Sequence, residues 1–288
     1  MSTVEVAYGA NPGRLAVIAG EIGKLPAFVR RDFLLAWSYR LAFFSELGAM
    51  LLQTVTFYFL GDMISSSSLP TYGGNQVTYM EFVAIGLALS LFMAIALSQV
   101  AMAIRTEQMI GTLESVLVTP TAPTTIQIGS VCYALIFIPI RILAFLGIVV
   151  LIFGLDFHWG GLGPAIAVLL AFIPFVWGLG LMSAGAILTF KRATAGVGVI
   201  VALLTLASGA YFPLALLPAW AEWLAQYNPL AIATSGMRDS LLGGTGWSGV
   251  GPELAALAAL SAVAVVAGIG AFRLALGRER RRGTLGLY

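Results

Sequence analysis

The side chains that could carry out chemistry in this chain are few and far apart. The sequence has one histidine, His158, and one cysteine, Cys132, so a zinc site of the usual Cys/His kind lacks ligands. His158 also has no nucleophile pattern close to it, as acyl-transfer catalysis would require. We therefore predict no catalytic residue, no metal site, no disulfide and no cofactor held by this chain.

The two lysines exclude a phosphate-binding loop of the Walker A type. That loop needs the pattern Gly-x-x-x-x-Gly-Lys-Ser/Thr, but Lys24 is followed by Leu25 and Lys191 by Arg192. The chain is therefore expected not to hydrolyse ATP by itself.

The composition explains why polar chemistry is so scarce. Of the 288 residues, 59% are hydrophobic and 10% are charged, against about 45–50% and about 25% in soluble domains. So few charged side chains cannot cover a surface that faces water. The sequence predicts an all-α integral membrane protein that is surrounded by lipid. Its formal net charge of +2 is too small to indicate a nucleic-acid partner.

Apolar segments long enough to cross a bilayer, which takes about 20 residues in a helix, recur six times. Alternating strand patterns are absent, so helices rather than barrel strands are expected. The expected spans are residues 41–61, 81–104, 125–153, 163–190, 193–211 and 254–276. Residues 25–276 then form a single transmembrane domain between a tail of residues 1–24 and a basic tail of residues 277–288.

The basic residues orient these spans. All of them except Arg141 and Arg238 fall before the first span, at the end of the sixth or after it, or in the loops after the second and fourth. Because cytoplasmic loops are rich in Lys and Arg, both termini are expected in the cytoplasm. Arg238 is then expected outside.

Arg141 lies within the third span, where an arginine at the centre costs about 2.5–3.5 kcal/mol on insertion scales. Glu46 in the first span is the nearest acid at that depth, and we expect the two to pair or to face one cavity. In the alternative, Arg141 lies nearer an interface and extends its charge to it. Phe57 of the first span is a candidate for the wall of a lateral pathway between the first and fifth spans.

A short amphipathic segment precedes the first span and begins near Pro26. Its apolar residues recur about every four positions and are Phe28, Val29, Phe33, Trp37 and Leu41. Arg30 and Arg31 occupy the other face. Such a helix is expected to lie in the membrane interface with its arginines toward phosphates. The alternative is a cytoplasmic extension of the first span.

A second amphipathic segment, residues 105–119, follows the second span. Met109, Leu113 and Leu117 share one face, and the polar face carries Glu107, Gln108, Thr112, Glu114 and Ser115. Pro120 ends the pattern. We predict a cytoplasmic helix that docks onto another protein, with a helical loop on the membrane as the alternative.

Residues 213–242 are apolar, but Pro213, Pro218 and Pro229 prevent one straight helix. From Pro218 to Asn228 there is room for about three turns, or half a bilayer. We predict a helical hairpin that enters from outside and turns at Asn228 and Pro229, with Trp220 near the outer interface.

In this order of parts the chain resembles the membrane (permease) subunits of ABC-2 type exporters, also called type V ABC exporters. One matching stretch is Gly111-Thr-Leu-Glu-Ser-Val-Leu-Val-Thr-Pro120, which is similar to the coupling segment of that family. The other is Ser208-Gly-x-x-Phe-Pro-Leu-x-x-Leu-Pro-x-Trp220, which includes Phe212 and is followed by Asn228-Pro-Leu230. The run Glu107-Gln-Met-Ile is less charged than in the family, which leaves open how Glu107 contacts a partner.

The resemblance implies a homodimer of this chain with two copies of a separate ABC ATPase, which binds ATP and Mg. The residues implied in ATPase coupling are Glu107, Gly111, Thr112, Glu114, Thr119 and Pro120. The expected function is ATP-driven export of an amphipathic drug, lipid or glycan across the plasma (inner) membrane. An ion-gradient-driven secondary transporter is the alternative, although broken helices in both halves would then be expected. A membrane scaffold is a third.

Overall fold

The computed structural model describes residues 20, 23–61, 63, 69–110, 123–190 and 194–282. Within these ranges all regular structure is helical, apart from one isolated bridge between Tyr72 and Asn75. The α-helices are α2 (Leu25–Ser38), α3 (Arg40–Gly61), α4 (Tyr79–Ile110), α6 (Pro123–Phe153), α7 (Leu162–Thr189), α8 (Thr194–Leu206), α9 (Ala219–Ala225), α10 (Pro229–Leu241) and α11 (Gly251–Arg282). Two 3-10 turns are η2 (Trp159–Gly161) and η3 (Leu214–Leu216). The predicted all-α class is confirmed for this part of the chain.

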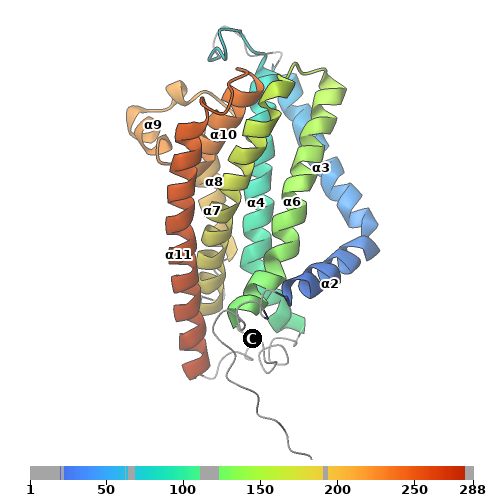
Figure 1. Ribbon diagram of the computed structural model, residues 1–288, viewed down its shortest axis with the longest axis vertical. Helices are drawn as coiled ribbons and strands as arrows, with labels where there is room; N and C mark the ends of the chain where they lie inside the picture. The colour runs from blue at the N-terminus through green and yellow to red at the C-terminus, as the bar shows by residue number, and fades with distance from the viewer. Residues whose placement is uncertain are drawn as a thin grey trace, which may run out of the picture.

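The long helices stand upright in one bundle with α4 inside it (Figure 1). From Phe82 to Ser90 every residue of α4 is buried, because other helices cover it on all sides. The rings of Phe92 in α4 and Phe172 in α7 lie 5.9 Å apart between their centroids in this core. Aliphatic and aromatic packing therefore holds the centre of the bundle together.

Four stretches of the described chain are long and apolar enough to cross a membrane. They are Tyr79–Met102, Ile136–Phe153, Trp159–Thr189 and Gly251–Arg278, and they match the second, third, fourth and sixth expected spans. The first expected span forms α3, which is not among these four. The six-span arrangement therefore remains a prediction.

The fifth expected span is shorter than predicted, since α8 ends at Leu206 rather than near Tyr211. The hydroxyl of Ser208 donates to the carbonyl of Thr205 at 2.7 Å and accepts from the N–H of Ala210 at 3.2 Å. Gly209 follows with a φ of 67°, a left-handed conformation that suits glycine. The local turn at these residues ends the helix.

The boundary between the second span and the predicted coupling helix also differs from expectation. Residues 105–110 continue α4 to Ile110 instead of starting a separate helix, because neither glycine nor proline interrupts them. Gly111, Thr112, Glu114, Thr119 and Pro120 lie outside the described residues, and so does the side chain of Glu107. The predicted coupling segment is therefore described only for the backbone of its first turns.

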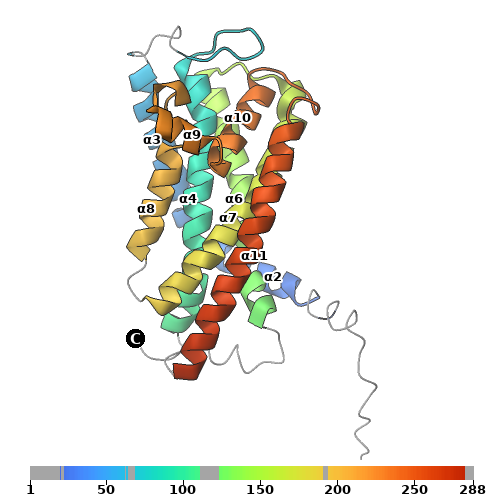
Figure 2. The same ribbon diagram turned by 90° about the vertical axis from the view of Figure 1, so that its left-hand side faces the viewer.

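The segment before the first span folds as a separate helix. Tyr39, with φ −106° and ψ 47°, interrupts the chain between α2 and α3. As a result α2 is set at an angle to α3 and crosses the lower part of α6 (Figures 1 and 2). α2 is therefore a helix separate from the first span, and its position in the membrane interface remains a prediction.

Small residues bring α7 and α11 into close contact. A Cβ atom at Gly268 would lie 2.3 Å from the carbonyl oxygen of Gly178, so the two backbones touch. Ser261 of α11 donates a hydrogen bond to the carbonyl oxygen of Ala171 in α7 at 2.9 Å. Close backbone approach at small residues is a common way for membrane helices to pack.

Candidate functional site

An extensive set of polar contacts in the described core centres on Arg238. Its Nε and Nη2 atoms donate to the carbonyl oxygen of Phe82 at 3.0 and 2.9 Å. Nη1 donates to the carbonyl of Gly209 at 2.9 Å, and Nη2 to that of Ala210 at 2.9 Å. The residue is 5% exposed, and its guanidinium carbon lies 3.5 Å from the centroid of the Phe82 ring. Arg238 thus joins α10 to α4 and to the bend after α8.

Arg238, which the sequence predicts on the outer side, is buried, and backbone carbonyls take the place of water around its charge. Gly86 makes this arrangement sterically feasible, since a Cβ there would lie 2.1 Å from the carbonyl oxygen of Ala210. The phenol of Tyr72, in the loop before α4, lies beside the guanidinium. Burial raises the pKa of this phenol, an effect that Arg238 only partly opposes, so Tyr72 remains neutral.

Arg238 is absent from the predicted site residues. One sequence feature does mark it: it is the only Lys or Arg in the segments assigned to the outer side, against the usual distribution of positive charge.

The predicted hairpin segment contains two helices joined by a short turn. The turn ends at Asn228, whose Oδ1 accepts from the N–H of Leu230 at 3.0 Å and caps α10. The Nδ2 of Asn228 donates to the carbonyl of Leu204 in α8 at 2.7 Å. Pro229 begins α10, as proline at the first helical position commonly does.

The two arms of this segment are unequal. The outer arm, α9, has seven residues after Pro218, which is shorter than the predicted three turns, and it lies on the flank of the bundle (Figure 1). α10 has 13 residues and is mostly buried against α4, α7 and α11. Pro213 is buried and Phe212 is half-buried, whereas the side chain of Trp220 is outside the described atoms. Insertion of this hairpin into the membrane remains a prediction.

Glu46 and Arg141 come together between α3 and α6, as the sequence predicts. The Nη1 atom of Arg141 donates to Oε2 of Glu46 in a salt bridge. The side chain of Arg141 is 11% exposed and that of Glu46 is 49% exposed. The arginine thus has a carboxylate partner within the bundle, and any role of the pair in transport remains a prediction.

Phe57, the candidate pathway residue, is half-buried in α3. Its ring stacks on Tyr211 with 5.0 Å between the centroids. The hydroxyl of Tyr79 in turn donates to the carbonyl oxygen of Tyr211 at 2.9 Å. Phe57 therefore connects α3 to the bend after α8, close to the contacts of Arg238.

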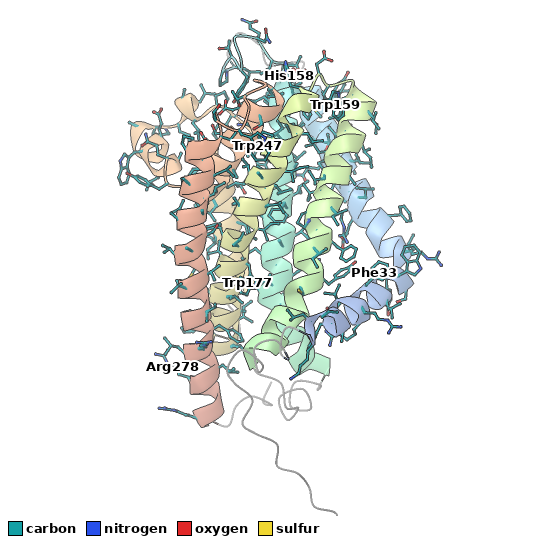
Figure 3. The ribbon with its side chains drawn as sticks, viewed as in Figure 1. Phe33, His158, Trp159, Trp177, Trp247 and Arg278 are labelled. Carbon is teal, nitrogen blue, oxygen red and sulfur yellow. The ribbon has the colours of Figure 1, made fainter. Side chains whose placement is uncertain are left out.

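The aromatic residues of α2 pack on α6. The ring of Phe28 covers Gly129, where a Cβ would lie 2.6 Å from ring atoms. Phe33, in the lower part of the molecule (Figure 3), packs against Phe137 at 5.6 Å between centroids and against Trp37 at 6.0 Å. This contact holds α2 across the lower part of α6.

The two arginines of α2 differ in their surroundings. Arg31 pairs with Asp32 at 2.7 Å, and its guanidinium lies 5.5 Å from the Phe28 ring. Arg30 is exposed. Because Phe28 and Phe33 pack on α6, whereas an interfacial helix buries its apolar face in lipid, the interfacial position of α2 remains a prediction.

The carboxylate of Glu81 joins the start of α4 to the loop after α6. Its carboxylate accepts from the N–H and hydroxyl of Thr78 at 2.7 and 2.9 Å, which caps α4, and from the N–H of Asp156 at 3.2 Å. The N–H of His158 donates to the carbonyl of Leu241 at 2.8 Å, and His158 lies at the top of the bundle (Figure 3). Within the described residues no cluster of three or more His, Cys, Asp or Glu could hold a metal ion.

The sequence was compared with models of known protein families. A family model described as ABC-2 type transporter matches residues 24–242. This chain belongs to the ABC-2 type transporter family. A search of curated proteins finds no match.

The ABC-2 match begins one residue before α2 and ends one residue after α10. It therefore includes the Arg238 contacts and the pair of Glu46 and Arg141, but not α11. As an ABC-2 permease, the chain is a multi-pass membrane component of an ABC transporter and is not itself the ATPase. Membership of the family implies a partner ABC ATPase.

Proposed function

We propose that this ABC-2 permease is the membrane subunit of an ATP-driven exporter. It moves an amphipathic drug, lipid or glycan-type substrate out of the cell. Two copies of the chain form a homodimer in the plasma (inner) membrane, with all termini in the cytoplasm. Two copies of a separate ATPase bind ATP and Mg²⁺ at the cytoplasmic face.

The extent of the family match carries this proposal. It covers α2, the end of α4 and the α9–α10 segment, which are the parts that a permease needs to contact an ATPase and to close its outer side. Both lysines stand outside any Walker A pattern, so the energy source must be another subunit.

α4 supplies a mechanical link between the two ends of the molecule. It is one 32-residue helix, about 48 Å long at 1.5 Å per residue. Its first turn carries Phe82, whose carbonyl oxygen binds Arg238, and its last turns carry Glu107 and lead into the other proposed ATPase-docking residues. Movement of that docking segment therefore reaches the outer contacts through a continuous helix.

Nucleotide drives the cycle only if it binds one arrangement of the permease more favourably than the other. In this proposal Glu107, Thr112 and Glu114 dock on the ATPase, with Gly111 allowing close approach and Thr119 and Pro120 ending the segment. Closure of the two ATPases then displaces α4 and α2 together.

The direct test uses inside-out membrane vesicles that contain the chain and its ATPase. Export in the cell corresponds to ATP-dependent accumulation of a fluorescent amphipathic dye inside such vesicles. Glu114→Arg should abolish both accumulation and stimulation of the ATPase. Asp156→Arg, the same charge change in an exposed outer loop, is the matched control and should retain both.

Two outcomes distinguish the alternatives. Uptake that follows an imposed ion gradient and needs no ATP would favour a secondary transporter. Normal ATP-driven transport by the Glu114→Arg variant would contradict the assignment of the docking segment while leaving the family membership intact.

A further inference from the structure

An open apolar groove separates α2 from α6 in the lower part of the bundle. Its volume is about 530 Å³, within the range of about 300–1,000 Å³ that is usual for small-molecule sites. Its walls are Leu25, Pro26, Val29, Arg30, Phe33, Cys132, Ile136 and Phe137. Of these eight, only Arg30 carries a charge.

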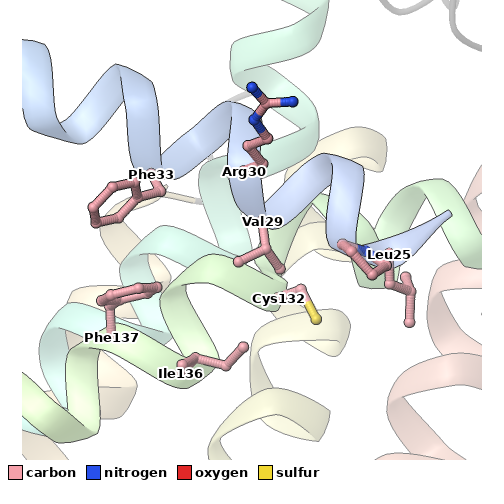
Figure 4. Close-up of a pocket in the computed structure, with 8 residues that line it drawn as sticks. Leu25, Val29, Arg30, Phe33, Cys132, Ile136 and Phe137 are labelled. Atoms are coloured by element: carbon pink, nitrogen blue, oxygen red, sulfur yellow. The ribbon is translucent and has the colours of Figure 1, made fainter. Parts of the chain in front are cut away.

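The side chains divide this groove into an apolar floor and a cationic mouth. Val29 of α2 and both Cys132 and Ile136 of α6 face the space between the helices, while the guanidinium of Arg30 points away from α6 (Figure 4). A ligand that lies on the floor and extends past the edge of the groove therefore gains most from an apolar part and an anionic part.

The charge of Arg30 is available to such a ligand. Arg31 pairs with the neighbouring Asp32, whereas no carboxylate in the described part of the chain lies within ion-pair distance of Arg30, which is exposed. A guanidinium binds phosphate through two parallel N–H groups. Basic residues beside a membrane helix attract the anionic lipids of the cytoplasmic leaflet.

We propose that this groove binds an anionic phospholipid, with one acyl chain on the apolar floor and the phosphate on Arg30. A neutral lipid contacts only the apolar floor, and a free phosphate contacts only Arg30. The lipid fills the space between α2 and α6 and so supports the angle at which α2 crosses the bundle. This site is separate from any transported substrate and does not depend on the direction of transport.

The single thiol of the protein reports on occupancy, because Cys132 lies in the groove wall and is partly exposed. The rate of its alkylation by a maleimide is measured on the full chain in neutral detergent. The added probes are phosphatidylglycerol, phosphatidylcholine or inorganic phosphate. We expect phosphatidylglycerol to slow alkylation about fivefold more than phosphatidylcholine, the scale of one basic residue at an anionic surface.

Arg30→Gln should remove the difference between the two lipids. Arg278→Gln, which changes an exposed arginine at the far end of α11 (Figure 3), should retain it. Equal protection by both lipids, or an unchanged difference in Arg30→Gln, would overturn the anionic site. Equal protection by inorganic phosphate would overturn the role of the acyl chain.

A count of bound lipid by native mass spectrometry provides an independent measurement. The wild type should retain one phosphatidylglycerol per chain. Ile136→Trp fills the floor of the groove and should lose it, whereas Ile140→Trp, one turn along α6 at an exposed position outside the groove, should keep it. Retention of the lipid by the Ile136→Trp variant would overturn the proposal even if the thiol proves unreactive.

Discussion

The guanidinium of Arg238 holds the carbonyl oxygen of Phe82 through two of its nitrogens, at 3.0 and 2.9 Å. The two residues are 156 positions apart, yet this contact fixes α10 to the first turn of α4. Because the same side chain also binds the carbonyls of Gly209 and Ala210, three separate segments depend on one charge.

Arg238→Met should destabilise the protein. The substitution leaves the carbonyls of Gly209 and Ala210 without this donor, and buried acceptors that lose a partner cost about 1–3 kcal/mol each. We expect a loss of about 2–4 kcal/mol, measured as a lower midpoint of thermal unfolding in detergent. Arg238→Lys should be intermediate, since an ammonium retains the charge but has a smaller reach.

The control for this prediction is Arg278→Met, which removes an exposed arginine from the end of α11 and should leave the midpoint unchanged. Equal midpoints for Arg238→Met and the wild type would show that the contacts contribute little to folding.

The pair of Glu46 and Arg141 should respond asymmetrically to substitution. Arg141 is the more buried partner, so Glu46→Gln takes the carboxylate from a buried cation, whereas Arg141→Gln leaves a half-exposed acid. We expect Glu46→Gln to cost about 1–3 kcal/mol and Arg141→Gln to cost less. Thermal unfolding of each variant measures both values.

Exchange of the two charges tests whether the pair acts as a unit. Glu46→Arg combined with Arg141→Glu should be more stable than the sum of its single changes, which is a favourable coupling in a double-mutant cycle. An exchange no better tolerated than either single change would contradict the pairing.

The position of α2 should depend on Gly129. Gly129→Ala introduces a methyl group 2.6 Å from the Phe28 ring, so the ring and the part of α2 that carries it must give way. If α2 transmits ATPase closure, stimulation of the ATPase should fall several-fold while the unfolding midpoint changes little. Gly147→Ala in the same helix has open space around its Cβ and should show normal stimulation, and equal behaviour of the two variants would argue against a coupling role for α2.

Sequence patterns predict well those features that depend on local composition. The expected span 163–190 differs by one residue at each end from α7 (Leu162–Thr189), because a long apolar run defines it. The contact of Glu46 with Arg141 could also be predicted, since two opposite charges among apolar residues have few other partners.

Features that depend on the approach of distant backbones could not be predicted. The partners of Arg238 are carbonyl groups, which every residue has, so side-chain patterns do not reveal them. Their availability depends on the turn at Ser208 and Gly209 and on the lack of a side chain at Gly86. The same turn ends α8 at Leu206. The hydrophobic pattern does not predict this helix end, because the residues that follow Leu206 are apolar as well.

The contact between α7 and α11 predicts that alanine substitutions at two glycines of α11 should change the unfolding midpoint in different directions. A Cβ at Gly268 would lie 2.3 Å from the carbonyl of Gly178, whereas a Cβ at Gly270 meets nothing within 4 Å. Alanine is favoured over glycine in a helix by about 1 kcal/mol, so Gly270→Ala should leave the unfolding midpoint equal or higher. Gly268→Ala should lower it by several degrees, since the gain in propensity does not offset the separation of two packed backbones. A Gly268→Ala variant as stable as Gly270→Ala would show that α7 and α11 do not touch at this position.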